Sequence, residues 1–312
     1  KDYPNDSLLF NISGACYAGL GQFDAAVKDY EKAIAIKPDY SKAHFNLGCT
    51  LQELGQLDAS AKSFEKSIVI EPGYAEAHNN LGIALKDLRQ LDAAVKSFKK
   101  AITIKPDYVE AHYSLGTTFH ELGQLDDAVK SYEKVIAIKP DNADVHFNLG
   151  DTLRELVQLD KAVKCYEKAL AIKPDFDEAL NNLGITYYQL GQLDKAVKCY
   201  EKALAIKPDY ANAYYHLSFI KKYTANDQQI TKMKSFLSNS NLSQSERIQL
   251  CFALAKVNEN LDNQDEFFKY LHEANRLRKQ ELNYSFDLSK TLFSSVKEMF
   301  GSAYSDIEKS LS

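Results

Sequence analysis

The sequence lacks the features of membrane-spanning proteins and of nucleic-acid-binding proteins. No stretch approaches the ~18 uninterrupted apolar residues of a membrane span, and no run of Lys and Arg forms the basic stripe of a nucleic-acid binder. The 38 basic residues are outnumbered by 43 acidic ones, so the formal net charge is −5. We therefore expect neither a membrane segment nor a nucleic-acid partner.

Catalytic and metal-binding signatures are also missing. Gly-x-Ser-x-Gly and Cys-x-x-Cys are absent, and the glycines between residues 14 and 21 form no phosphate loop, because they fall in a predicted helix and its turn. His120 and Glu121 begin like a zinc-protease helix, but the second histidine is missing. The five scattered cysteines are expected to be free thiols in a reducing cytoplasm. The sequence thus predicts a cytoplasmic protein without a catalytic site, metal or cofactor.

Proline is scarce, and every proline follows one period of 34 residues. The prolines are Pro4, Pro38, Pro72, Pro106, Pro140, Pro174 and Pro208. This period is typical of a helical repeat array and argues against a compact two-domain enzyme. Because Lys1 is neither an initiator methionine nor the start of a signal peptide, we interpret it as a cut inside a longer chain with further repeats before it.

Six full repeats cover residues 7–210 when Ser7 is counted as position 1, and a seventh begins at Ala211. Positions 4, 7, 8 and 11 form one stripe of a first helix, with glycine always at position 8. Small residues at position 20 and aromatic residues at position 24 mark a second helix, which the proline ends because the residue before it is disfavoured in the α conformation. Each helix pair needs a neighbour to cover its apolar face. The fold is therefore predicted to be an all-α solenoid of helix-turn-helix repeats.

The pattern Leu-Gly-x2-Leu/Tyr, Ala, Phe/Tyr, Ala and Pro resembles the tetratricopeptide repeat over about two thirds of the chain. The resemblance implies a right-handed superhelical solenoid whose concave groove binds proteins or peptides. Position 4, usually tryptophan in that family, departs from the pattern, and the chain has no tryptophan at all. The residues there are Phe10, His44, His78, His112, His146 and Leu180. The histidines lie one repeat apart, too far for a shared zinc, so we expect them in the core or at its edge.

A row of polar residues is predicted on the first helices, opposite the packing stripe. Four repeats have asparagine at position 6, namely Asn46, Asn80, Asn148 and Asn182. An amide side chain can pair with both the N–H and the C=O of an extended peptide. The row resembles the asparagine ladder of the O-linked N-acetylglucosamine transferase superhelix, and Asn79 and Asn181 are expected to supplement it. The alternative is that exposed positions are polar without any ligand.

Charge on the same face favours a basic or neutral partner. Its acids are Glu53, Glu76, Asp87, Glu110, Glu121, Asp144, Asp151, Glu155 and Glu178, and its bases are Lys42, Lys86, Arg154 and Lys222. The acidic excess would steer a basic, extended peptide toward the groove, unless the charges are merely solvated. Chaperone-binding members of the family grip a C-terminal carboxylate with a lysine at position 5. This chain has none, so we do not expect that activity.

The repeat period stops after Pro208. We assign residues 1–223 to the repeat array and residues 224–312 to a divergent helical C-terminal region, with helices predicted at 230–237, from Ser243 to about residue 260, at 265–282 and at 287–300. Ser243 and Glu246 have the spacing of a capping box. Residues 248–281 match a degenerate eighth repeat, and the last helix is expected to cap the apolar end of the solenoid.

A second resemblance concerns the C-terminal region. Its segments YTANDQQITKM, LSQSERIQLCFALAKVNENL, YLHEANRLRK and NYSFD are similar to the linker between tetratricopeptide arrays and sulfotransferase domains. The resemblance implies that this chain is the non-catalytic, substrate-positioning arm of a larger enzyme. We favour a protein- or peptide-binding scaffold, with the sulfotransferase arm and self-association of the solenoid as alternatives.

Overall fold

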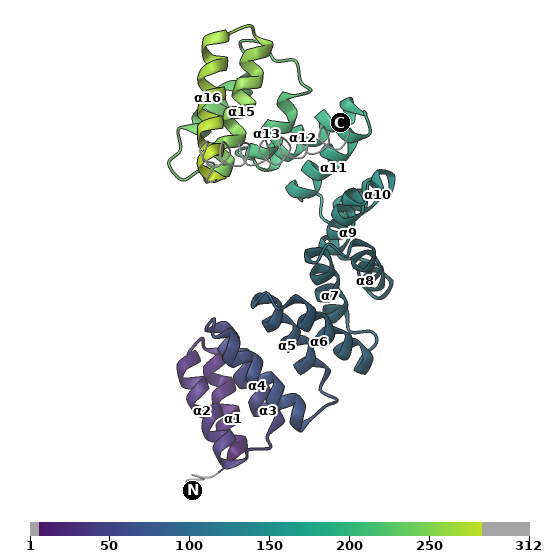
Figure 1. Cartoon of the computed structure of the whole chain (residues 1–312), viewed down its shortest axis with the longest axis vertical. Coiled ribbons are helices and arrows are strands. Elements are labelled where there is room, and N and C mark those ends of the chain that lie inside the picture. The colour runs from purple at the N-terminus through teal and green to yellow at the C-terminus, as the bar shows by residue number, and fades with distance from the viewer. Residues whose placement is uncertain (1–5, 283–312) are drawn as a thin grey trace, which may run out of the picture. The chain divides into compact units, whose positions relative to one another are not determined.

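The computed structural model describes residues 6–282, which form sixteen α-helices without a strand in that range (Figure 1). Twelve of these helices form six pairs. The first helices of the pairs are α1 (Ser7–Gly19), α3 (Ser41–Glu53), α5 (Ala75–Asp87), α7 (Val109–Glu121), α9 (Ala143–Glu155) and α11 (Asp177–Gln189). The second helices are α2 (Phe23–Ile36), α4 (Leu57–Ile70), α6 (Leu91–Ile104), α8 (Leu125–Ile138), α10 (Leu159–Ile172) and α12 (Leu193–Ile206). The bounds repeat every 34 residues, which confirms the predicted helix-turn-helix solenoid.

Glycine at position 8 permits the two helices of each repeat to pack closely. A Cβ atom added to Gly116 would lie 2.7 Å from an edge carbon of the Tyr132 ring, and one added to Gly82 would lie 2.6 Å from the Phe98 ring. Tyr132 and Phe98 are buried, so neither ring can move aside cheaply. The loss of helix propensity at these glycines is thus offset by close packing against the aromatic residue at position 24.

Local sequence determines where the helices begin and end. Each second helix ends two residues before a proline. The residue between the helix end and the proline is not in the α conformation, because the proline disfavours it there. Lys37, for example, has φ −133° and ψ 89°. An aspartate recurs at position 18 of the repeats, as Asp24 does in the first, and it lies in the first turn of the second helix. The helix dipole stabilises a carboxylate there. The preceding glutamines, such as Gln22, make no side-chain cap.

The tight turn between paired helices requires a left-handed residue at position 15. Gly55 and Gly123 have φ of 72° and 70° there. Arg89 and Val157 occupy the same position in their repeats, with φ of 61° and 59°. A β-branched side chain strongly disfavours this conformation, so the α9–α10 turn carries local strain.

The chain forms two compact units, Lys1–Asn182 and Leu183–Ser312, and each is described by itself. In the first unit the second helices α2, α4, α6 and α8 each pack between the first helices of their own and the next repeat. The first helices also contact one another directly, α1 with α3, α3 with α5, α5 with α7 and α7 with α9. The domain boundary that we predict at residue 223 marks the end of the repeat pattern and stays a prediction.

The second unit contains α12, α13 (Ala211–Ser218), α14 (Gln228–Leu237), α15 (Gln244–Asn260) and α16 (Gln264–Glu281). Three of the predicted C-terminal helices are present within a few residues of their expected bounds, and the one predicted at 287–300 lies outside the described residues. α15 and α16 pack as a pair, and α13 and α14 contact α15. Leu254, Ala255 and Ala274, at core positions of the predicted eighth repeat, are buried.

Candidate functional site

The candidate site is the surface formed by positions 2, 6, 9, 12 and 13 of the first helices, which we call the first-helix face. Direct contacts between consecutive first helices bring side chains of neighbouring repeats together there. The asparagines at position 6 are half-buried on this face and lie near the preceding repeat. The face therefore has a defined set of contacts, repeated along the first unit.

Each of the predicted ladder asparagines donates a hydrogen bond backward along the array. Asn46 Nδ2 donates to Asn11 Oδ1 at 3.0 Å, and Asn148 Nδ2 donates to the Tyr113 hydroxyl at 2.9 Å. Asn80 Nδ2 contacts Cys49 Sγ at 3.5 Å. An amide nitrogen has two N–H groups, so each of these bonds leaves one donor. The row thus links neighbouring repeats and keeps part of its hydrogen-bonding capacity.

Asn79 and Asn181 lie beneath the row. They are only 3% and 2% exposed, so they do not line the face as supplementary ladder residues. The Nδ2 of Asn79 donates to Asn80 Oδ1, and the Nδ2 of Asn181 donates to Asn182 Oδ1, both at 3.2 Å. Aromatic residues at the same position, Phe45 and Phe147, contact the ring at position 24 of the second helix. Asn79 and Asn181 instead bond to the amide of Asn80 or Asn182.

Asp151 is the centre of a polar cluster. From the sequence, this residue was expected only to add negative charge to the face. Its Oδ1 accepts from Asn182 Nδ2 at 2.7 Å and from the Tyr166 hydroxyl at 2.6 Å, and it lies 3.7 Å from the guanidinium of Arg154. Burial and the neighbouring Asp151 carboxylate raise the pKa of Tyr166. The signal in the sequence was an aspartate at position 9, where other repeats have small or apolar residues.

Only some of the acidic residues on the first-helix face form ion pairs. Glu121 pairs with Lys86 at 3.4 Å and with Arg89 at 3.3 Å, and Glu155 contacts His120 at 3.3 Å. Other acids of the face are exposed and make no ion pair with any described residue, namely Glu53, Asp87, Glu110, Asp144 and Glu178. The face of the first unit therefore presents unpaired carboxylates from five repeats.

The histidines at position 4 have a structural partner. Nε2 of each ring lies 2.8–3.1 Å from the carbonyl oxygen of the proline six residues earlier. His112 is buried and the other three are half-buried, as expected for core or edge positions. In the second unit the Tyr214 hydroxyl makes the same bond to the Pro208 carbonyl at 3.0 Å. The regular six-residue spacing between Pro and His was the signal that could have revealed this contact.

Within residues 6–282, no group of three or more His, Cys, Asp and Glu side chains could hold a metal ion. The helices described in that range include none with the length and apolar character that a membrane crossing requires. The first-helix face is thus the candidate that the sequence and the structure share.

Comparison with known proteins gives family matches between residues 14 and 210. A TPR repeat model matches residues 14–55, 84–123, 116–157 and 150–191, and tetratricopeptide repeat models match residues 41–74, 63–96 and 177–210. The family matches end at residue 210, before the segments that resemble the sulfotransferase linker, so that resemblance stays a prediction.

Individual relatives match parts of the chain. The peroxisomal targeting signal receptor of Kluyveromyces lactis is 41% identical over 44 residues, which are 14% of this chain and only 8% of the receptor. The structure of MamA is 28% identical with a TM-score of 0.51, and the match covers 53% of this chain and 96% of MamA. YrrB, described as a TPR protein with an unusual peptide-binding site, is 22% identical with a TM-score of 0.54, covering 59% of this chain and 95% of YrrB.

Proposed function

Because this chain belongs to the tetratricopeptide repeat family over residues 14–210, we propose that it is an interaction scaffold that binds a basic, extended segment of a partner protein along its first-helix face. The carrying observation is the set of exposed, unpaired carboxylates on that face, represented by Glu110 and Asp144 at position 2 of successive repeats. Carboxylates of one sign along a surface attract and orient a cationic partner.

The asparagine row supports an extended backbone as the bound form. Asn46 and Asn148 each keep one N–H group and a carbonyl oxygen beyond their bonds to the preceding repeat. Such groups pair with a peptide backbone irrespective of its side chains. Since consecutive first helices contact one another directly, a peptide bound along them would meet several repeats.

The test uses a fluorescein-labelled basic probe, an unstructured peptide of ~18 residues rich in arginine, lysine and glycine, whose binding is measured by fluorescence anisotropy. We expect E110K together with D144K to weaken binding at least about tenfold. Both side chains are exposed, and neither makes an ion pair, so the fold should be unaffected. E31K with E65K is the matched control, since it changes the net charge equally on exposed residues of the second helices.

The amide contribution is tested separately with N46A and N148A. Each variant loses one hydrogen bond between repeats, so stability falls by about 1 kcal/mol per site, and melting curves must accompany the binding data. The proposal fails if the basic probe binds the E110K/D144K variant as tightly as the unaltered chain, or if a glutamate-rich version of the probe competes for the same face.

A further inference from the structure

A different surface of the first unit carries two hollows, which lie between second helices of successive repeats. The first, which we call the Lys62 hollow, lies between α2 and α4, has a volume of about 380 Å³ and is floored by Ile34 and Leu47. The second, the Lys96 hollow, lies between α4 and α6 with a volume of about 450 Å³ and is floored by Ile68 and Leu81. The residues that line the two hollows occupy the same eight repeat positions, so the two are one site repeated.

The two lips of each hollow differ in charge. Lys62 and Lys66 form one lip of the first hollow, and Lys96 and Lys100 form the same lip of the second. All four lysines are exposed and make no ion pair with described residues. A single glutamate, Glu31 or Glu65, stands on the opposite lip. Each hollow therefore combines an apolar floor with a cationic side and a weaker anionic side.

Val69 adds an unusual apolar group to the Lys96 hollow. It is 76% exposed, the largest exposure among the valines and isoleucines at the ends of the second helices. The other repeats of the first unit have alanine or threonine at this position. An exposed valine beside a hollow of this size offers an anchor for an apolar side chain of a partner.

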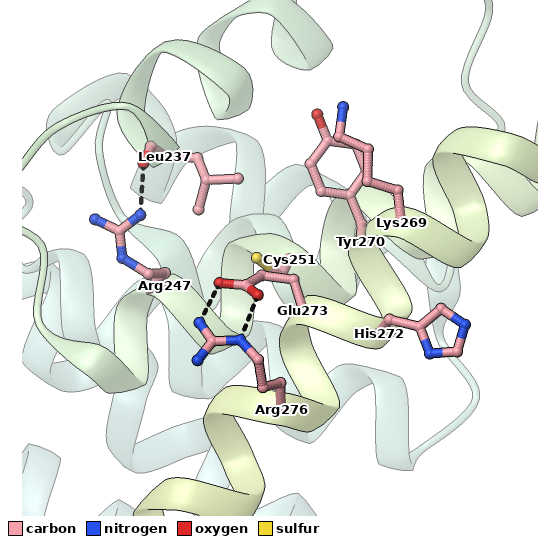
Figure 2. A pocket seen from close by; sticks show the side chains of 8 residues that line it. All are labelled: Leu237, Arg247, Cys251, Lys269, Tyr270, His272, Glu273 and Arg276. Carbon is pink, nitrogen blue, oxygen red and sulfur yellow. Dashed lines mark hydrogen bonds and ion pairs between the residues drawn. The ribbon is translucent and has the colours of Figure 1, made fainter.

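The second unit has a hollow at the corresponding place with altered chemistry (Figure 2). Its volume is about 430 Å³, and Cys251, Lys269, Tyr270 and Glu273 line it at positions 4, 22, 23 and 26 of the predicted eighth repeat. Glu273 replaces the second lysine and is held by Arg276 through bonds of 2.7 and 2.8 Å. Stacked helix pairs thus generate the hollow itself, whereas the pair of lysines belongs to the regular repeats.

We propose that the Lys62 and Lys96 hollows form a second binding face, which takes an acidic amphipathic helix of a partner protein. A helix laid across α4 would place apolar side chains in both hollows, one on each side of α4, and apolar anchors at i, i+3, i+4 and i+7 are typical of helix-in-groove complexes. Its carboxylates would meet the lysine lips, and uncharged or basic residues would meet Glu31 and Glu65. Nucleic acid fits less well, because phosphates gain nothing from the apolar floors and are repelled by the glutamates.

This second face selects the opposite charge from the first-helix face, so one scaffold can hold a basic and an acidic partner at once. The inference does not depend on the proposed function, because none of its residues lies on the first-helix face.

The test uses a fluorescein-labelled acidic probe of ~18 residues, about five helical turns, with leucine at i, i+3, i+4 and i+7 and a mixture of glutamate and glutamine at the other positions. Anisotropy with the intact chain should show saturable binding that K96E together with K100E weakens at least about tenfold. V69S should weaken it a few-fold by removing the apolar anchor. K139E with K232E changes the net charge equally on exposed lysines that lie outside the hollows and outside the first-helix face, and it should leave the affinity within about twofold.

Circular dichroism confirms folding, and K96A with K100A provides a milder pair of changes if charge reversal disturbs the fold. Equal weakening by K139E/K232E, or no weakening by K96E/K100E and K96A/K100A, would overturn the proposal. Tighter binding of single-stranded DNA than of the acidic probe, with competition between them, would assign the face to nucleic acid instead. The basic probe measured on the same variants reports separately on the first-helix face.

Discussion

At the scale of single residues, side chains of different chemistry form the same hydrogen bond in different repeats. The imidazole Nε2 of His44 and the Tyr214 hydroxyl both bond to the carbonyl of the proline six residues earlier. Five repeats thus have a polar ring with this bond at position 4, whereas Phe10 and Leu180 have no side-chain group that could form it. Position 15 is less tolerant, because its left-handed backbone suits glycine, yet Val157 occupies it in one repeat.

Replacing Val157 by glycine should raise the free energy of unfolding by about 1 kcal/mol, since it removes the cost of a left-handed β-branched residue. Val157 is 76% exposed, so little packing is lost. Urea denaturation measures the change. The reciprocal variant G123V, at a residue with φ 70°, should lose a similar amount, and a V157G protein no more stable than the unaltered chain would contradict the strain at this turn.

At the scale of helices, α15 shows how a local motif begins an element without help from the repeat pattern. The Ser243 Oγ accepts from the backbone N–H of Glu246 at 3.2 Å, and Glu246 Oε2 accepts from the Ser243 N–H at 3.0 Å. The hydrogen bonds from Ser243 lower the pKa of Glu246. Because the folded pKa is lowered, the stabilisation is present above the unfolded value of 4.5 and is lost as the pH falls through the folded value.

We expect S243A to weaken the start of α15 by about 1 kcal/mol, seen as faster hydrogen exchange of the first amides of the helix. E246Q should keep the capping geometry, because an amide oxygen can still accept, but should remove its dependence on acid pH. S245A, an exposed neighbour in the first turn, is the control. Unchanged exchange in S243A, or an unaltered acid profile in E246Q, would show that the cap contributes nothing.

At the scale of the whole molecule, buried tyrosines make the stability of both units depend on pH in the alkaline range. Burial raises the pKa of Tyr30, Tyr74, Tyr108, Tyr214 and Tyr270 to about 12 and also raises the pKa of Tyr132 and Tyr200. A folded pKa above the unfolded value of 10.0 means that the stabilisation is complete below pH 10. It is lost as the pH rises toward about 12.

The urea midpoint should therefore be steady up to pH 10 and fall between pH 10 and 12. Y132F should reduce this fall, because the equivalent Phe64 and Phe98 pack against their glycines without a hydroxyl. Y17F, at a side chain that is 37% exposed, serves as the control. An alkaline profile of Y132F identical to that of the unaltered chain would show that this hydroxyl does not limit stability at high pH.

The sequence by itself determined the repeat period, the bounds of the paired helices and the capping box at Ser243. These features depend on contacts within a few residues, such as proline at the end of a helix, or on contacts within one repeat, such as glycine against an aromatic ring. Only the tertiary structure decided that Asn79 lies beneath the row and that Asn46 and Asn148 donate to the preceding repeat. It also decided where the hollows lie. Those contacts join residues about one repeat apart, and they depend on the directions of side chains when helix pairs stack, which no local pattern encodes.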